Sequence, residues 1–87
     1  MFVIMAYDVN VKRVNKILKL CRKYLNWIQN SLFEGELTKS KLEKLKIALG
    51  NIINPEEDSI IFYTFRTTKY MEKEIMGVEK NNLSTFL

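Results

Sequence analysis

The chain begins with an unbroken apolar run, residues 2–7, which stops at Asp8. A run of this kind is typical of a central strand that other elements cover on both faces. The run is far too short to span a bilayer, and it lacks the basic start and the small-residue cleavage site of a signal peptide. We therefore expect a strand that leaves Asp8 at its C-terminal edge, and no membrane partner.

A helix is predicted directly after this strand. Asn10 is a candidate N-cap, and apolar side chains recur at helical spacing between Val11 and Leu25. The opposite face is rich in lysine, which makes the helix amphipathic.

The next segment, residues 26–33, alternates in the manner of a half-buried strand, with Trp27 and Phe33 on its more polar face. Glu34-Gly35 is a candidate turn into a short return strand. A single bent strand explains the same residues equally well, so both forms remain open.

A second helix is predicted from Thr38, a candidate N-cap, until the chain reaches Pro55. A capping box formed by Ser40 and Glu43 is the alternative start. The helix has to end before the proline, because the residue preceding a proline resists helical angles.

Two further strands are predicted in the last third of the chain. Residues 59–65 are rich in aromatic and β-branched side chains, and residues 71–78 form a second candidate strand with a bend at Gly77. The order of elements fits one α+β domain over residues 1–87. Its expected fold is a ferredoxin-like two-layer sandwich in which two helices cover an antiparallel sheet.

Composition narrows the chemistry. The chain of 87 residues has 14 Lys and Arg against 10 Asp and Glu, which is a mild lean toward polyanionic partners. It contains no His, which excludes histidine bases and histidine metal ligands. Its single cysteine excludes an internal disulfide framework and suits a reducing cytosol.

Asp8 is the main candidate for chemistry, because a carboxylate at the end of a buried strand is rigidly placed. Magnesium is commonly held by one or two carboxylates together with water and substrate phosphates. A two-fold axis near Asp8 would bring a second copy of the same carboxylate from a partner chain. The alternative is that Asp8 is an ordinary turn or capping residue.

Cations and aromatic rings give weaker signals. Lys12, Arg13 and Lys16 lie at the start of the first predicted helix, where cations oppose the helix dipole, so a phosphate partner is one interpretation and a solvated basic face is the other. Tyr7, Trp27 and Phe33 could stack on bases, although such rings more often belong to a core or an interface. Ser31 and Gln29 are candidate phosphate contacts or solvated strand residues.

Two segments together resemble the CRISPR-associated protein 2 family. The first is the apolar strand that ends in Tyr7-Asp8, and the second is residues 28–37, in which Gln29, Ser31 and Phe33 follow a hydrophobic-Gln-x-Ser-hydrophobic-Phe pattern. The similarity extends over nearly the whole chain, and the chain length agrees with it.

The resemblance implies a homodimer whose C-terminal strand crosses to the partner's sheet, with the tail from about residue 79 docked on the partner. It also implies a magnesium-dependent (or manganese-dependent) endonuclease for RNA or double-stranded DNA, with a metal between the two Asp8 residues. Tyr7, Arg13, Ser31 and Phe33 match the remaining catalytic positions. Trp27 departs from the family pattern, because some members have a basic residue there.

The resemblance further implies a role as the central bridge between integrase dimers of CRISPR-associated protein 1, in the complex that inserts new spacers. Three functions therefore stay open: a cytoplasmic nuclease, a catalytically silent DNA-binding scaffold that uses Lys12, Arg13 and Lys16, and a ferredoxin-like dimer with an unrelated regulatory role.

Overall fold

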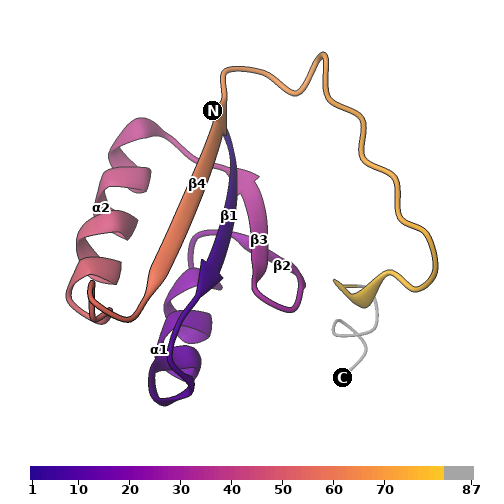
Figure 1. Cartoon of the computed structure of the whole chain (residues 1–87). Coiled ribbons are helices and arrows are strands. Elements are labelled where there is room, and N and C mark those ends of the chain that lie inside the picture. Colours follow the sequence, from indigo (N-terminus) through magenta and orange to yellow (C-terminus); the bar gives the residue numbers. More distant parts are fainter. Residues whose placement is uncertain (82–87) are drawn as a thin grey trace.

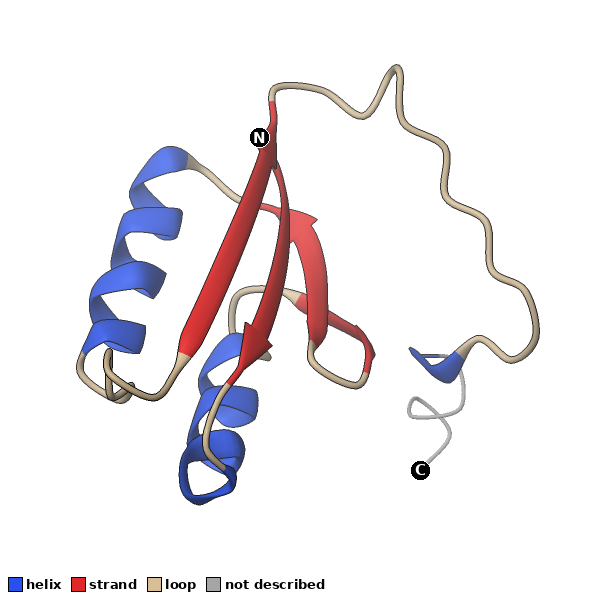
Figure 2. Cartoon of the chain, in the orientation of Figure 1, coloured by secondary structure: helices blue, strands red, loops and turns tan. Residues whose placement is uncertain are grey.

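The computed structural model describes residues 1–81, which form a sheet with helices packed on one of its faces (Figures 1 and 2). In chain order the elements are β1 (Phe2–Asp8), α1 (Val11–Cys21), β2 (Asn26–Gln29), β3 (Leu32–Glu36), α2 (Lys39–Gly50) and β4 (Ser59–Phe65). No helix in the described part of the chain is long and apolar enough to cross a membrane.

The sheet has four strands in the order β2-β3-β1-β4, and every neighbouring pair is antiparallel. The apolar run at the start of the chain therefore becomes an inner strand, between β3 and β4. This arrangement confirms the ferredoxin-like α+β fold expected from the sequence.

The two faces of the sheet differ in how they are covered. Val3, Met5 and Tyr7 of β1 point into the core beneath the helices, where Ile17 and Leu45 meet them. The alternate residues of β1 point the other way, as the period of a strand requires. We call this second side the open face.

Residues paired directly across the sheet share a face, so the register defines the open face further. It carries Ile4 opposite Tyr63, Ala6 opposite Ile61, and Asp8 opposite Ser59. Tyr63 and Ile61 are about half exposed, which leaves apolar surface uncovered around the middle of β4.

Both predicted N-caps are confirmed. The Asn10 side chain accepts a hydrogen bond from the Lys12 N–H at 3.0 Å, and the Thr38 hydroxyl accepts one from the Lys41 N–H at 3.1 Å. The first helix ends at Cys21, before the predicted limit at Leu25, although Leu25 is still buried. The apolar spacing therefore continued past the end of the helix into the turn that follows it.

The structure matches neither form that the sequence left open, because two strands are present and the turn between β2 and β3 lies before Glu34-Gly35. Asn30 turns the chain with a positive φ of 40°, and Glu34-Gly35 lies inside β3. Asparagine is one of the few residues other than glycine that adopt left-handed angles at modest cost. Phe33 is consequently buried beneath the helices, and its predicted place on the polar face is wrong.

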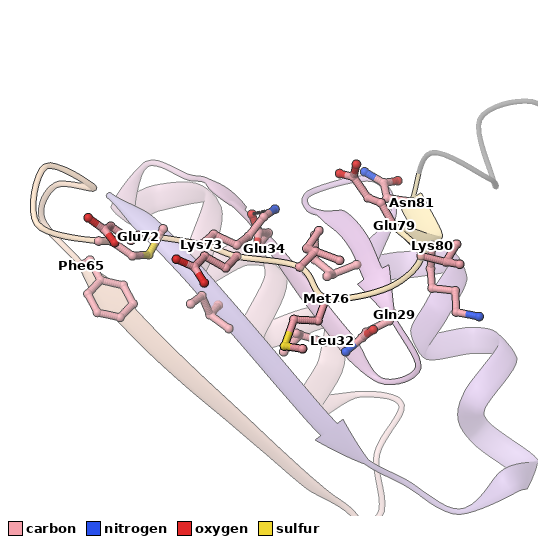
Figure 3. Close-up of a pocket in the computed structure, with 16 residues that line it drawn as sticks. Gln29, Leu32, Glu34, Phe65, Glu72, Lys73, Met76, Glu79, Lys80 and Asn81 are labelled. Atoms are coloured by element: carbon pink, nitrogen blue, oxygen red, sulfur yellow. Dashed lines mark hydrogen bonds and ion pairs between the residues drawn. The ribbon is translucent and has the colours of Figure 1, made fainter.

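The strand predicted at residues 71–78 is absent from the described chain. After β4 the backbone runs extended and returns across the open face, where the Lys73 Nζ meets the Glu34 Oε2 at 3.1 Å (Figure 3). A segment that crosses a sheet face has no strand edge to bond with, so no ladder forms. The bend predicted at Gly77 is confirmed, with a φ of 90°.

Residues 71–81 and the open face enclose a cavity of about 420 Å³, lined on the sheet side by Ile4, Leu32 and Glu34. Ile75, Met76 and Val78 stay exposed. This segment, which we call the C-terminal arm, therefore covers the open face without packing tightly on it. The apolar tail predicted to dock lies beyond residue 81, outside the described residues.

Candidate metal and nucleic-acid site

Asp8 is the last residue of β1 and its side chain is exposed on the open face. The seven-residue β1 pairs with β4 as far as Asp8 and Ser59, so the backbone beneath the carboxylate is held in the sheet. Within residues 1–81 no hydrogen bond or ion pair engages the Asp8 carboxylate. It is thus a fixed anion whose oxygen atoms are available to an external cation.

Tyr7 and Phe33 lie on the opposite side of the sheet from Asp8. Their ring centroids are 6.2 Å apart with the planes tilted by 33°, and both rings are buried. Burial is also the main cause that raises the pKa of the Tyr7 hydroxyl. In the single chain these rings therefore support β1 from below, where a base cannot stack on them.

Ser31 lies at the same end of the sheet as Asp8. Its carbonyl oxygen accepts a hydrogen bond from the Tyr7 N–H at 3.1 Å, which joins the turn after β2 to the end of β1. The residue is half-buried. The fold therefore holds the Ser31 backbone against the residue that precedes Asp8.

Arg13 is bound to two carboxylates of its own chain. Its Nε lies 2.5 Å from the Asp58 Oδ2, and its Nη2 lies 2.7 Å from the Glu57 Oε2 and 3.0 Å from the Asp58 Oδ1. These bonds raise the pKa of Arg13 and hold the pKa of Asp58 well below its ordinary value. The sequence suggested phosphate as the partner of this cation, and the structure gives it Asp58 and Glu57.

Asp58 is the functional candidate that sequence reasoning missed. Residues 56–58 form a run of three acids, which has the composition of an exposed acidic turn. Only the last of them is buried, with no exposed side-chain surface. The one available signal was Arg13, a cation at a helix start where it needs compensation.

The basic residues of α1 that are not paired with acids face solvent. Lys12 and Lys16 are exposed, as are Lys19 and Lys23 further along the same helix and turn. This surface retains positive charge that can meet phosphates. Arg13, in contrast, contributes little charge outward because two carboxylates compensate it.

The described chain alone does not provide a complete metal site. Among residues 1–81, no group of three or more acidic, cysteine or histidine side chains is placed to hold a metal ion. Asp8 offers the hard oxygen donors that magnesium and manganese accept, and such ions keep several water ligands and bind substrate phosphate. The carboxylate of Asp8 is therefore suited to be one of several ligands of a divalent metal ion.

Fold and site together define a small ferredoxin-like protein that carries a strand-end carboxylate on the open face of its sheet and a helix with exposed lysines. The family model described as CRISPR associated protein Cas2 matches residues 1–73. The chain therefore belongs to the Cas2 family.

Relatives and solved structures agree with this assignment. The chain is 59% identical over 87 residues, all of both chains, to the CRISPR-associated endoribonuclease Cas2 of Dictyoglomus turgidum. It is 55% identical over 80 residues, 92% of each chain, to the protein of the same name from Thermotoga maritima. A Cas2 crystal structure superposes with a TM-score of 0.83 at 45% identity, covering 92% of this chain and 90% of the other.

A second solved structure, Streptococcus pyogenes Cas2 at pH 6.5, superposes with a TM-score of 0.78 at 35% identity. The match covers 88% of this chain and 100% of the other chain. The fold described above is therefore the fold of known Cas2 proteins.

Proposed function

We propose that this protein is a metal-dependent endonuclease of CRISPR adaptation that acts as a homodimer, with Asp8 of each subunit as a metal ligand. The observation that carries the proposal is the exposed Asp8 carboxylate, fixed at the end of β1 and without a partner in residues 1–81. The relatives named endoribonucleases support RNA as the first substrate to test, with double-stranded DNA as the second.

Apolar side chains of β4 on the open face support the proposed dimer. Ile61, Tyr63 and Phe65 expose between 37% and 54% of their surface on β4, next to the loosely packed arm. A second copy that covers the open face would bury these side chains and bring its own Asp8 to the interface. β4 is an edge strand, so it also offers an unpaired backbone to the partner's arm, which would then form the strand predicted at residues 71–78.

Each residue has a stated role in this proposal. Asp8 from both subunits holds the metal, and Lys12 and Lys16 attract the phosphates of the substrate. Ser31 bonds a phosphate oxygen, while Tyr7 and Phe33 keep β1 rigid beneath the site. When bound, a divalent metal, magnesium or manganese, would offset the negative charge of the phosphate and activate the water that hydrolyses the phosphodiester.

A second candidate function is a scaffold that binds duplex DNA and bridges integrase dimers of CRISPR-associated protein 1 without cutting. The exposed lysines of α1 favour it, as does the lack of a metal-ligand cluster in residues 1–81. In this function affinity would come from phosphate contacts alone, so it would fall steeply as salt rises and would not depend on sequence.

Cleavage of labelled single-stranded RNA and duplex DNA in magnesium tests the proposal. We expect the Asp8→Asn protein to lose cleavage while it still forms a dimer and binds DNA. Glu43→Gln is the matched control, because it makes the same change of carboxylate to amide at an exposed position on α2. If wild type and Asp8→Asn both bind duplex DNA and neither cuts, the scaffold is the correct function.

A further inference from the structure

The chain buries one charged side chain among residues 1–81, and that residue lies outside the proposed catalytic set. The Asp58 residue is 9% exposed and its side chain is fully covered. Burial of a carboxylate is costly unless hydrogen bonds and an opposite charge compensate it.

Each oxygen of the Asp58 carboxylate accepts two hydrogen bonds. Oδ1 accepts from the Asn10 N–H at 2.8 Å and from the Arg13 Nη2 at 3.0 Å. Oδ2 accepts from the Arg13 Nε at 2.5 Å and from the Asn54 N–H at 2.9 Å. One side chain thus ties together the loop after β1, the first turn of α1 and the turn that leads into β4.

All these connections converge on the backbone beside Asp8. Asn10 is two residues beyond Asp8 in the chain, and Ser59, the residue after Asp58, is the partner of Asp8 in the sheet. Asp8 is therefore restrained along its own strand and also across the sheet. A strand end normally frays, because its last residues have few partners.

We propose that Asp58 is a positioning residue for Asp8: its four hydrogen bonds fix the end of β1, so that the Asp8 carboxylate stays in one place on the open face. This inference rests on the proposed function, in which a metal is shared by two Asp8 residues. A shared ligand set requires each carboxylate to be held within about 0.5 Å of its productive position. Asp58 supplies that restraint without touching metal or substrate.

The test measures binding of Mn²⁺ alone to the full-length protein by electron paramagnetic resonance, together with hydrogen exchange at residues 8–10. The variant is Asp58→Asn, which keeps the shape of the side chain and removes its charge. We expect it to weaken Mn²⁺ binding about tenfold, as loss of supporting groups around metal ligands commonly does. Exchange at residues 8–10 should become faster at the same time.

The control is Leu42→Ala, which truncates a buried side chain of α2 in the hydrophobic core. It lowers stability through a cavity but leaves the hydrogen bonds of Asp58 in place. Measured below the unfolding transitions of all variants, its Mn²⁺ affinity should equal that of the wild type. Equal weakening by Leu42→Ala would mean that general stability controls binding, and it would overturn the inference.

A second pair of variants serves if Asp58→Asn does not fold. Arg13→Lys keeps the positive charge but loses the planar guanidinium that donates to both oxygens of Asp58. Lys19→Arg is the control, because it makes the reverse change at an exposed position on the same helix. We expect weaker Mn²⁺ binding only in Arg13→Lys, and unchanged binding in both variants would contradict the positioning role.

The outcomes separate this inference from the proposed function. Wild-type protein that binds Mn²⁺ through Asp8, with unchanged affinity in Asp58→Asn and Arg13→Lys, overturns the positioning role alone. Wild-type protein that neither binds Mn²⁺ nor cuts nucleic acid overturns the proposed function, and the positioning role with it.

Discussion

At the scale of single residues, Asp58 links the stability of the protein to pH. Its hydrogen bonds with Arg13, and those from the Asn10 and Asn54 N–H groups, stabilise the charged carboxylate and lower its pKa from the ordinary value of 3.8. A lowered folded-state pKa contributes stability above the unfolded-state pKa, and this contribution is lost as the pH falls toward the folded-state pKa. The loss from this group should therefore begin near pH 4 and continue below it.

Thermal unfolding of wild type and Asp58→Asn between pH 2 and 7 measures this linkage. We expect the variant to melt on the order of 10 °C lower at pH 7, because it leaves Arg13 without its main partner. The difference should stay constant down to about pH 5 and shrink below about pH 4, because Asp58 of the unfolded wild-type chain takes up a proton there while the folded carboxylate stays charged. A difference that stays equally large at pH 2 would contradict this assignment.

Cys21 gives a second prediction at this scale. Its thiol is fully buried, with the Sγ 3.6 Å from the Met5 Sδ, and burial raises its pKa to about 12. Because the thiolate is the reactive form, the folded protein should resist iodoacetamide at pH 8 and react only after unfolding. Mass spectrometry of native and urea-treated samples measures this, and rapid labelling of the native protein would contradict it.

At the scale of elements, the start of α2 depends on one hydroxyl. Thr38 caps the helix by accepting from the Lys41 N–H, whereas Ser40 lies inside α2 and is exposed. We expect Thr38→Ala to lower the free energy of unfolding by about 1 kcal/mol. Thr38→Ser keeps a capping hydroxyl, so it should retain most of this stabilisation. Ser40→Ala is the control and should have little effect. Chemical denaturation measures all three, and the opposite ranking would assign the cap to Ser40.

Elements with a strong local signal could be predicted from the sequence. Residues close in the sequence were enough to identify the apolar run that forms β1. The same is true of the two cap residues, Asn10 and Thr38. The turn at Asn30 was missed because Glu34-Gly35 offered a glycine nearby. Moving a turn changes which residues face the core, since neighbouring strand residues point to opposite faces, and this is why Phe33 was placed on the wrong side.

The candidate site divides in the same way. Asp8 follows an apolar run, so its position at a strand end could be predicted locally. The role of Asp58 depends on Asn10 and Arg13, which are 48 and 45 residues away in the chain. Only the folded chain brings these groups together, and the composition of an acidic turn does not distinguish the buried acid from its exposed neighbours.

At the scale of the whole molecule, one copy leaves much of its apolar surface without a close-packed cover. The arm crosses the open face above a cavity of about 420 Å³, and Met76 in the arm is 97% exposed. Small domains bury a limited apolar area in their core, and association with a second copy is a common way to bury more. The proposed dimer would thus complete the fold and the metal site in the same step.

A mixing experiment tests whether both copies of Asp8 are needed. Wild-type and Asp8→Asn chains are unfolded and refolded together, so that subunits combine at random. If the metal requires Asp8 from both subunits, only dimers with two wild-type chains cut, and an equal mixture retains about a quarter of the activity of the same total amount of wild-type protein. A mixture with Glu43→Gln in place of Asp8→Asn should retain the full wild-type activity.

Activity that falls only to about half would show that each Asp8 works independently. The metal would then need its remaining ligands from water and substrate.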